Sequence, residues 1–139
     1  MRESTLWDHL KPELQAKGKF QKLSDRFSPG VPDVLGCFAS LGIAIELKEL
    51  KGVLVIKTKF RPGQLDWLED WYKAGGTSWV VSTWGNTAYV HPWTAGPALE
   101  AGMSSEELSQ GAILEFRKIR GNSWGNFVDQ LLGLDREEK

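Results

Sequence analysis

The six residues from position 43 to position 48 alternate more regularly than any other part of the sequence. A period of two predicts a β-strand, because successive side chains of a strand point to opposite faces of a sheet. Two isoleucines and a leucine would then share one face, while Ala44, Glu46 and Lys48 share the other. A chain built around this strand has to form a sheet with one apolar face, and it has to hold an acid beside a lysine on the other.

The segments before this strand predict a helix and two further strands. Leucines at four-residue spacing over residues 6–14 indicate an amphipathic helix, in which Pro12 should cause a kink or a restart. Residues 20–27 and 33–39 are expected to be strands, separated by a turn at residues 28–30, and Leu41-Gly42 is the expected turn before the strand described above.

The segments after it predict a helix and a hairpin. Pro62 sits where a first helical residue would, and Gly75-Gly76 marks the helix end. Residues 78–84 and 87–91 alternate around a two-residue Gly-Asn loop, which favours a β-hairpin. Residues 52–60 fit a strand or a loop. The pattern then weakens. A helix is expected to start near Ser104, and a last amphipathic helix is expected over residues 124–132. The fold class is therefore α/β, a mixed sheet flanked by helices.

Two carboxylates are expected to converge on neighbouring strands. Asp33 opens one strand and Glu46 lies on the next, and adjacent strands run only about 4.8 Å apart. Clustered carboxylates repel one another unless a cation lies between them, so the pair predicts a Mg²⁺ or Mn²⁺ site. Lys48 shares the face of Glu46 and could orient an attacking water, and the carbonyl of Leu47 could serve as a further metal ligand. Such a centre suits phosphodiester hydrolysis.

The Glu-x-Lys triplet occurs twice in succession, as Glu46-Leu47-Lys48 and as Glu49-Leu50-Lys51. A single copy is weak support for catalysis, because solvated strand faces often contain one. Strand parity separates the two copies. Glu49 and Lys51 fall on the face that the core should occupy, close to the end of the strand. We therefore assign the chemistry to the first copy.

Three motifs taken in order resemble the PD-(D/E)xK nuclease superfamily: Ser-Pro-Gly-Val-Pro-Asp at residues 28–33, Ile-Glu-Leu-Lys at 45–48, and Arg-Pro-Gly-Gln at 61–64. The sequence is most similar to the small virus-type (VRR-NUC) and Holliday-junction-resolvase-like nucleases. The resemblance implies a restriction-endonuclease-like core of order αβββαβ over residues 1–91, with residues 92–139 as a helical extension packed on the same domain. It implies Asp33 and Glu46 as metal ligands, Lys48 as the catalytic lysine, and Gln64 near the site or the DNA backbone.

This family usually adds an acid from the first helix. Glu3 is the first choice, since it shares a face with Leu6 and Leu10. The alternative is that an acid in a first turn only stabilises the helix dipole, and the two interpretations stay equally open. Glu13 and Asp25 are lesser candidates.

Positive charge is concentrated near the strand, although the net charge of the 139 residues is only −1. The basic stretch runs from Lys48 to Arg61 and could follow a phosphate backbone, or it could be a solvated loop. With the resemblance in view, we expect Lys51, Lys59, Arg61 and Gln64 to contact nucleic acid.

Other conspicuous residues are expected to be structural. His9 and His91 have no third ligand at metal spacing. Cys37, the single cysteine, is expected to be a packed thiol. Tryptophans could stack on unpaired bases, but their periodic positions favour the core or a subunit contact.

These patterns together predict a Mg²⁺- or Mn²⁺-dependent endodeoxyribonuclease, a hydrolase selective for junctions or branches, as the resemblance implies. Resolving a four-way junction takes two symmetric cuts, so a homodimer is expected, joined through the last helix or exposed tryptophans. The alternatives are a nuclease-like fold that binds DNA or protein without cutting, and an unrelated α/β enzyme. With no apolar run long enough to span a bilayer, the expected location is the cytoplasm, or the host cytoplasm for a viral protein.

Overall fold

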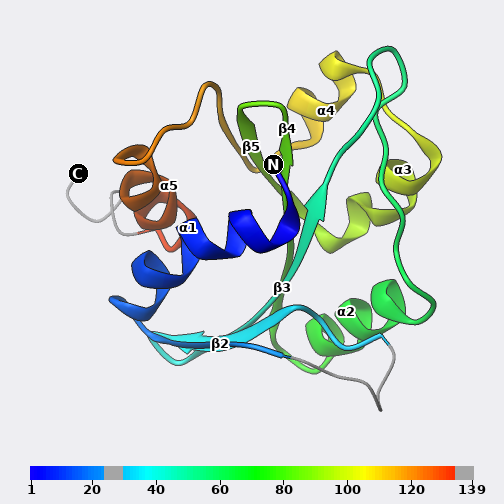
Figure 1. Cartoon of the computed structure of the whole chain (residues 1–139). Helices are drawn as coiled ribbons and strands as arrows, with labels where there is room; N and C mark the ends of the chain where they lie inside the picture. Colours follow the sequence, from blue (N-terminus) through cyan, green and yellow to red (C-terminus); the bar gives the residue numbers. More distant parts are fainter. Residues whose placement is uncertain (24–29, 134–139) are drawn as a thin grey trace.

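The computed structural model describes residues 1–23 and 30–133, which form one six-stranded mixed sheet with helices on both faces (Figure 1). The strands lie in the sheet in the order in which they occur in the sequence. Every neighbouring pair is antiparallel except β3 and β4, which are parallel. The strands are β1 (Lys19–Lys22), β2 (Val34–Phe38), β3 (Leu41–Glu49), β4 (Thr77–Trp84), β5 (Thr87–Pro92) and β6 (Leu114–Phe116).

The helices form two layers, one on each face of the sheet. Helices α1 (Glu3–Gln15) and α5 (Ser123–Leu131) cover one face, where they also contact each other. Helices α2 (Gln64–Lys73), α3 (Gly96–Ala101) and α4 (Ser105–Gly111) cover the other, together with the short 3-10 helix η1 (Trp93–Ala95). Helix α2 makes the crossover that the parallel pair β3–β4 requires.

The alternation within β3 divides its side chains between these two layers. Ile43, Ile45 and Leu47 are buried with the leucines of α1, whereas Ala44 is buried against the α2 layer. The parity predicted from the sequence is confirmed. Glu46 and Lys48 consequently lie on the face that carries α2.

The predicted order of helix, three strands, helix and hairpin is confirmed, with shifted boundaries. The first strand is shorter and begins earlier than the predicted residues 20–27; residues 24–29, which include Asp25 and most of the expected 28–30 turn, lie outside the described residues. The turn into β3 is Ala39-Ser40 and not Leu41-Gly42. Both turn residues have positive φ values, 50° and 69°, as a two-residue hairpin requires.

Helix boundaries differ near the two prolines. Helix α1 continues through Pro12 to Gln15 instead of restarting; Pro12 lies in the exposed last turns, where only one backbone hydrogen bond is lost. Helix α2 begins at Gln64 because the preceding Gly63, at φ 87°, turns the chain into it. Residues 50–63 form a loop with two isolated bridges, Lys51–Lys57 and Ile56–Met103.

The segment after β5 contains elements that the sequence did not predict. The short helices η1 and α3 follow β5 directly, and β6 adds a sixth strand by pairing with β5. The helix at Ser104 is confirmed: the Ser104 hydroxyl accepts from the Glu107 backbone N–H while the Glu107 carboxylate accepts from the Ser104 N–H. None of the described helices has the length and apolarity that a membrane crossing demands.

Candidate active site

Asp33 and Glu46 meet where β2 begins beside the middle of β3. The last register pair between these strands is Val34 with Ile45, so the next opposed positions are Asp33 and Glu46. Directly opposed residues of antiparallel strands share one face, with Cβ atoms about 5 Å apart. The Asp33 Oδ2 atom accepts a hydrogen bond of 2.8 Å from the backbone N–H of Leu47. The structure therefore brings the two predicted carboxylates together.

Glu46 is a buried acid in the middle of the sheet. Its side chain has no exposed surface, and neither carboxylate oxygen has a hydrogen-bond partner among the described residues. Burial, followed by the close approach and the charge of Asp33, raises the pKa of Glu46 to about 10, against the opposing charges of Lys48 and Arg61. Two ionised carboxylates have no proton to donate to each other. Without a cation, the buried Glu46 carboxyl therefore favours its protonated form.

A divalent cation fits between Asp33 and Glu46 in place of the proton on Glu46, because it would supply the missing partners of the Glu46 oxygens. The Leu47 carbonyl leaves the strand on the same side as the Leu47 N–H, which donates to Asp33, so it is available as a third oxygen. No group of three or more His, Cys, Asp or Glu side chains is arranged to hold a metal within residues 1–23 and 30–133. Mg²⁺ nevertheless needs only one or two carboxylates when waters and substrate phosphates complete its shell.

Lys48 is held beside the carboxylates by neutral groups. Its side chain is only 6% exposed. The Lys48 Nζ donates a 3.1 Å hydrogen bond to Gln64 Oε1 and lies 4.9 Å from the centre of the Phe60 ring. Gln64 Oε1 also accepts a 2.7 Å hydrogen bond from the backbone N–H of Arg61. Since no described carboxylate forms an ion pair with Lys48, its charge remains available to an anionic substrate.

Glu3 lies at the rim of the site and does not join the pair. Helix α1 covers the face opposite to Glu46, so its first turn approaches the site only at the end of the sheet. Burial is the largest cause of a raised pKa at Glu3; the charge of Asp33 also raises it, and nearby Lys48 and Arg61 lower it. Glu13 lies farther along α1 and faces Gly125 of α5. Neither acid completes a three-carboxylate cluster.

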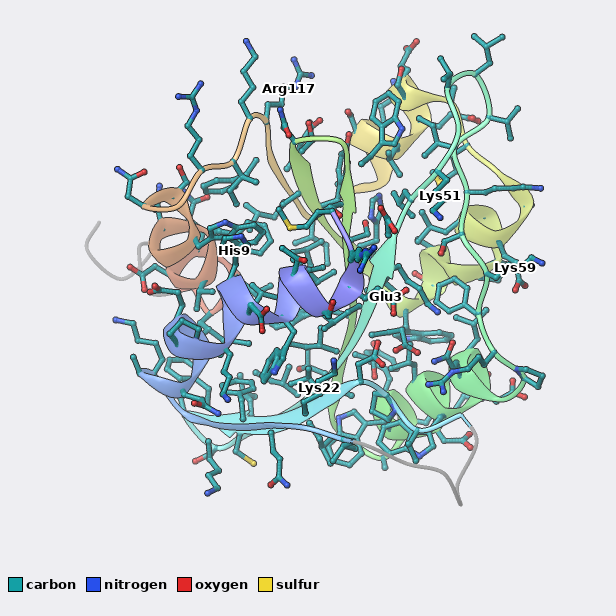
Figure 2. The ribbon with its side chains drawn as sticks, viewed as in Figure 1. Glu3, His9, Lys22, Lys51, Lys59 and Arg117 are labelled. Carbon is teal, nitrogen blue, oxygen red and sulfur yellow. The ribbon has the colours of Figure 1, made fainter. Side chains whose placement is uncertain are left out.

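A groove of about 690 Å³ runs past Glu3 along the loop between β3 and α2. Two of the predicted nucleic-acid contacts, Lys51 and Lys59, line it, and Figure 2 shows both on the same side of the molecule as Glu3. Gln64 lies deeper, against Lys48. Sequence reasoning assigned no role to Lys57 or Phe60, which also line the groove. Lys57 belongs to the basic stretch and could have been included on that ground.

The residues expected to be structural lie outside the site, with one correction. The His91 ring is buried, and its Nε2 is 2.9 Å from the Leu108 carbonyl oxygen. His9 stacks on Trp124 with ring centres 5.0 Å apart. The prediction of a packed thiol at Cys37 is wrong: this side chain is exposed, close to the turn that ends the β2–β3 hairpin.

No protein-family model and no curated protein sequence matches this chain. Among solved structures, the chain is similar to Hjc, a Holliday junction resolvase from the archaeal hyperthermophile Archaeoglobus fulgidus. The TM-score is 0.55 at 14% sequence identity, and the match covers 75% of this chain and 88% of the resolvase. A likeness at this identity bears on the fold. The chain thus has the restriction-endonuclease-like α/β fold of the PD-(D/E)xK nucleases.

Proposed function

We propose that this protein is a metal-dependent endonuclease that hydrolyses DNA phosphodiester bonds. The observation that carries the proposal is the buried Glu46 carboxylate, which has no hydrogen-bond partner among the described residues and faces Asp33. Beside it lies Lys48, which forms no ion pair with a described acid. A buried carboxylate without partners is strongly destabilising. A bound metal ion would supply the partners that the Glu46 oxygens lack.

Asp33, Glu46 and the Leu47 carbonyl would hold Mg²⁺ or Mn²⁺, which supplies charge neutralisation at the scissile phosphate and a more acidic water. Asp33 is oriented for this role by the backbone N–H of Leu47. Lys48, fixed by Gln64 and Phe60, would orient the attacking water and offset negative charge on the phosphate. Glu3 at the rim would act only indirectly, on the charge of the site.

The groove beside the site supports DNA as the substrate. Lys51, Lys57 and Lys59 line it and can contact phosphates, although three glutamates line it as well. Arg61, at the exposed start of the turn into α2, would add a phosphate contact. Branched or junction DNA is the proposed substrate.

We also propose a homodimer, because symmetric cleavage of a four-way junction needs two active sites. The sequence predicted the last helix as one possible interface. Its apolar side is not available for this role, because Trp124, Phe127 and Val128 are buried within the α1–α5 layer. The dimer is checked by sedimentation or light scattering.

The direct test is cleavage of labelled branched and linear DNA with Mg²⁺, with Mn²⁺ and with EDTA. We expect metal-dependent cutting, preferentially of the branched substrate, that is lost in Asp33→Ala and Lys48→Met. The control is Glu69→Gln, a carboxylate on the outer side of α2 that pairs with Lys73 and should retain full activity. Absence of metal-dependent cutting on every substrate would refute the proposal.

Calorimetric titration with Mn²⁺ separates a nuclease from a fold that only binds DNA. A nuclease should bind Mn²⁺ in a manner that depends on Asp33 and Glu46. Glu49→Gln is the matched control, because it removes a carboxylate three residues away that faces the opposite layer. Equal Mn²⁺ affinity in Glu46→Gln and in the unmodified protein would exclude the proposed metal site.

A further inference from the structure

Three adjacent aliphatic side chains are exposed at the end of the loop that follows β3. Val53, Leu54 and Val55, here called the apolar tip, have 80%, 86% and 57% of their surface exposed. They are the most exposed cluster of large hydrophobic residues in the part of the chain that is described. Contiguous exposed aliphatic groups commonly mark an interaction site.

The tip is presented by a braced loop. Lys51 and Lys57 exchange two backbone hydrogen bonds of 3.0 and 2.9 Å across its base. Ile56, which is fully buried, pairs in the same way with Met103, with bonds of 2.8 and 2.9 Å. The Trp84 indole N–H donates to the Gly52 carbonyl at 2.9 Å.

Gly52 permits the sharp bend at the start of the tip. Its φ of 115° lies in a region that other residues rarely adopt, and a Cβ there would collide with the Val55 carbonyl oxygen. A tight turn with a clamped base holds its side chains outward at little further cost in conformational entropy on binding. The exposure of the tip is therefore built into the backbone.

The charges around the tip indicate which partner it meets. From residue 50 to residue 65 the chain contains four basic residues and no acid: Lys51, Lys57, Lys59 and Arg61. The three lysines line the groove that passes Glu3 at the rim of the candidate active site, and Figure 2 shows Lys51 and Lys59 along this loop, on the side of the molecule that displays Glu3. Glu3, Glu49 and Glu100 also line the groove, so the excess of positive charge lies in the loop that carries the tip. An apolar tip on a basic loop matches a polyanion with an apolar interior.

We propose that the apolar tip is a wedge that inserts between base pairs at the branch point of DNA lying in this groove. Aliphatic side chains that enter a base step unstack it, whereas single bases are usually held by aromatic rings. Unstacking costs least where stacking is already interrupted, so the wedge favours a branch over a continuous duplex. This role extends the proposed nuclease function and gives its site a structural preference.

The test measures opening of the branch point without cleavage. A three-way junction with 2-aminopurine at the branch point is titrated with protein in EDTA, and fluorescence reports unstacking. The unmodified protein should raise the fluorescence, and a Val53→Ser/Leu54→Ser variant should abolish most of that rise. We expect the affinity ratio of branched to linear DNA to fall about tenfold, the size expected for one buried leucine side chain.

Leu41→Ser is the matched control, because Leu41 is also half exposed, at 52%, but lies at the opposite end of β3. It should leave both the fluorescence rise and the affinity ratio unchanged. An equal response in the tip variant and the unmodified protein would overturn the wedge. So would tip-dependent binding to vesicles of anionic phospholipid combined with a tip-independent response to DNA.

Failure of the wedge and failure of the nuclease give different results. If branched DNA is cut with metal at the same preference over linear DNA in the tip variant, only the wedge is refuted. If the tip opens the branch point in EDTA but no DNA is cut with Mg²⁺ or Mn²⁺, the wedge stands and the nuclease function is refuted.

Discussion

The same three-residue sequence, Glu-Leu-Lys, occurs twice in a row, and the structure gives the two copies opposite environments. In the first copy, Glu46 and Lys48 are buried on the face that carries α2. In the second, the Glu49 side chain is 32% exposed and lies 3.4 Å from the amino group of Met1, and Lys51 lies on the exposed base of a loop.

The contrast arises from parity and from strand length. A shift of three residues along a strand moves a side chain to the other face, and β3 ends at Glu49, so the second lysine leaves the sheet. The Glu46 oxygens have no hydrogen-bond partner among the described residues, whereas the Glu49 carboxylate forms an ion pair with the amino group of Met1. The same local sequence therefore meets two different environments, and the fold decides which acid is buried without a partner.

The largest expected difference between the copies is in cleavage rate. Glu46→Gln should lower the rate of DNA cleavage about a thousandfold, since it removes the charge on one of the two carboxylates proposed to bind the metal. Glu49→Gln should not lower it, and by removing negative charge from the groove rim it should slightly tighten DNA binding. The measurement is single-turnover cleavage at saturating Mg²⁺. Equal losses in both variants would mean that the two copies are functionally alike.

The next difference concerns the lysines. Lys48→Met should lower the rate at saturating DNA about a hundredfold, because Lys48 is held at the site by Gln64 and the Phe60 ring. DNA affinity in Ca²⁺, measured by fluorescence anisotropy, should change little. A variant that binds DNA weakly but cuts at the normal saturated rate would assign Lys48 to binding alone.

The sequence was sufficient for the features that follow from short-range pattern. Alternation predicted β3 and its two faces, and a Gly-Asn pair predicted the β4–β5 hairpin. The register that opposes Asp33 to Glu46 is set by the turn at Ala39-Ser40, which the sequence placed two residues later. A long stretch of regular alternation specifies which face of a strand is buried, because a shift by one residue would move the apolar side chains out of the core.

Features that depend on distant segments were not predictable in the same way. The loop after β3 is shaped by the pairing of Ile56 with Met103, a residue far away in the sequence. Strand β6 has only three residues, too few to show an alternating pattern. Glu3 was the first choice to complete the site because it shares a helix face with Leu6, with helix-dipole stabilisation as an equally open alternative. That face packs on the layer opposite to Glu46, which only the arrangement of helices around the sheet reveals.

The two glutamates should also differ in how they set stability in the absence of metal. The pKa of Glu46 is raised from 4.5 to about 10 by burial and by Asp33. Between these values the folded protein binds a proton that the unfolded chain releases, so the free energy of unfolding falls as pH rises through this window. Glu46→Gln should remove this dependence and stabilise the metal-free protein by roughly 1–3 kcal/mol at pH 8.

Urea unfolding in EDTA at pH 5 and pH 8 measures this effect. Glu49→Gln should retain the pH dependence of the unmodified protein, since Glu49 is partly exposed and paired. Added Mn²⁺ should stabilise the unmodified protein most at the higher pH, because fewer protons then compete with the metal for Glu46. It should not stabilise Glu46→Gln. A pH dependence that survives Glu46→Gln would assign it to other groups.

The smallest expected effect belongs to Lys51, the lysine of the second copy. Lys51 is exposed and lines the groove beside Lys57 and Lys59. Lys51→Met should therefore weaken DNA binding about threefold. It should also reduce the slope of log affinity against log salt concentration by about one. Lys48 is buried and neutralised by no described acid, and in the proposed complex it would face the scissile phosphate and not the length of the groove. Its removal should change the catalytic rate and leave most of the salt slope in place. If Lys51→Met instead lowered the rate at saturating DNA and kept the slope, the second triplet would share the chemistry of the first, and burial would no longer distinguish them.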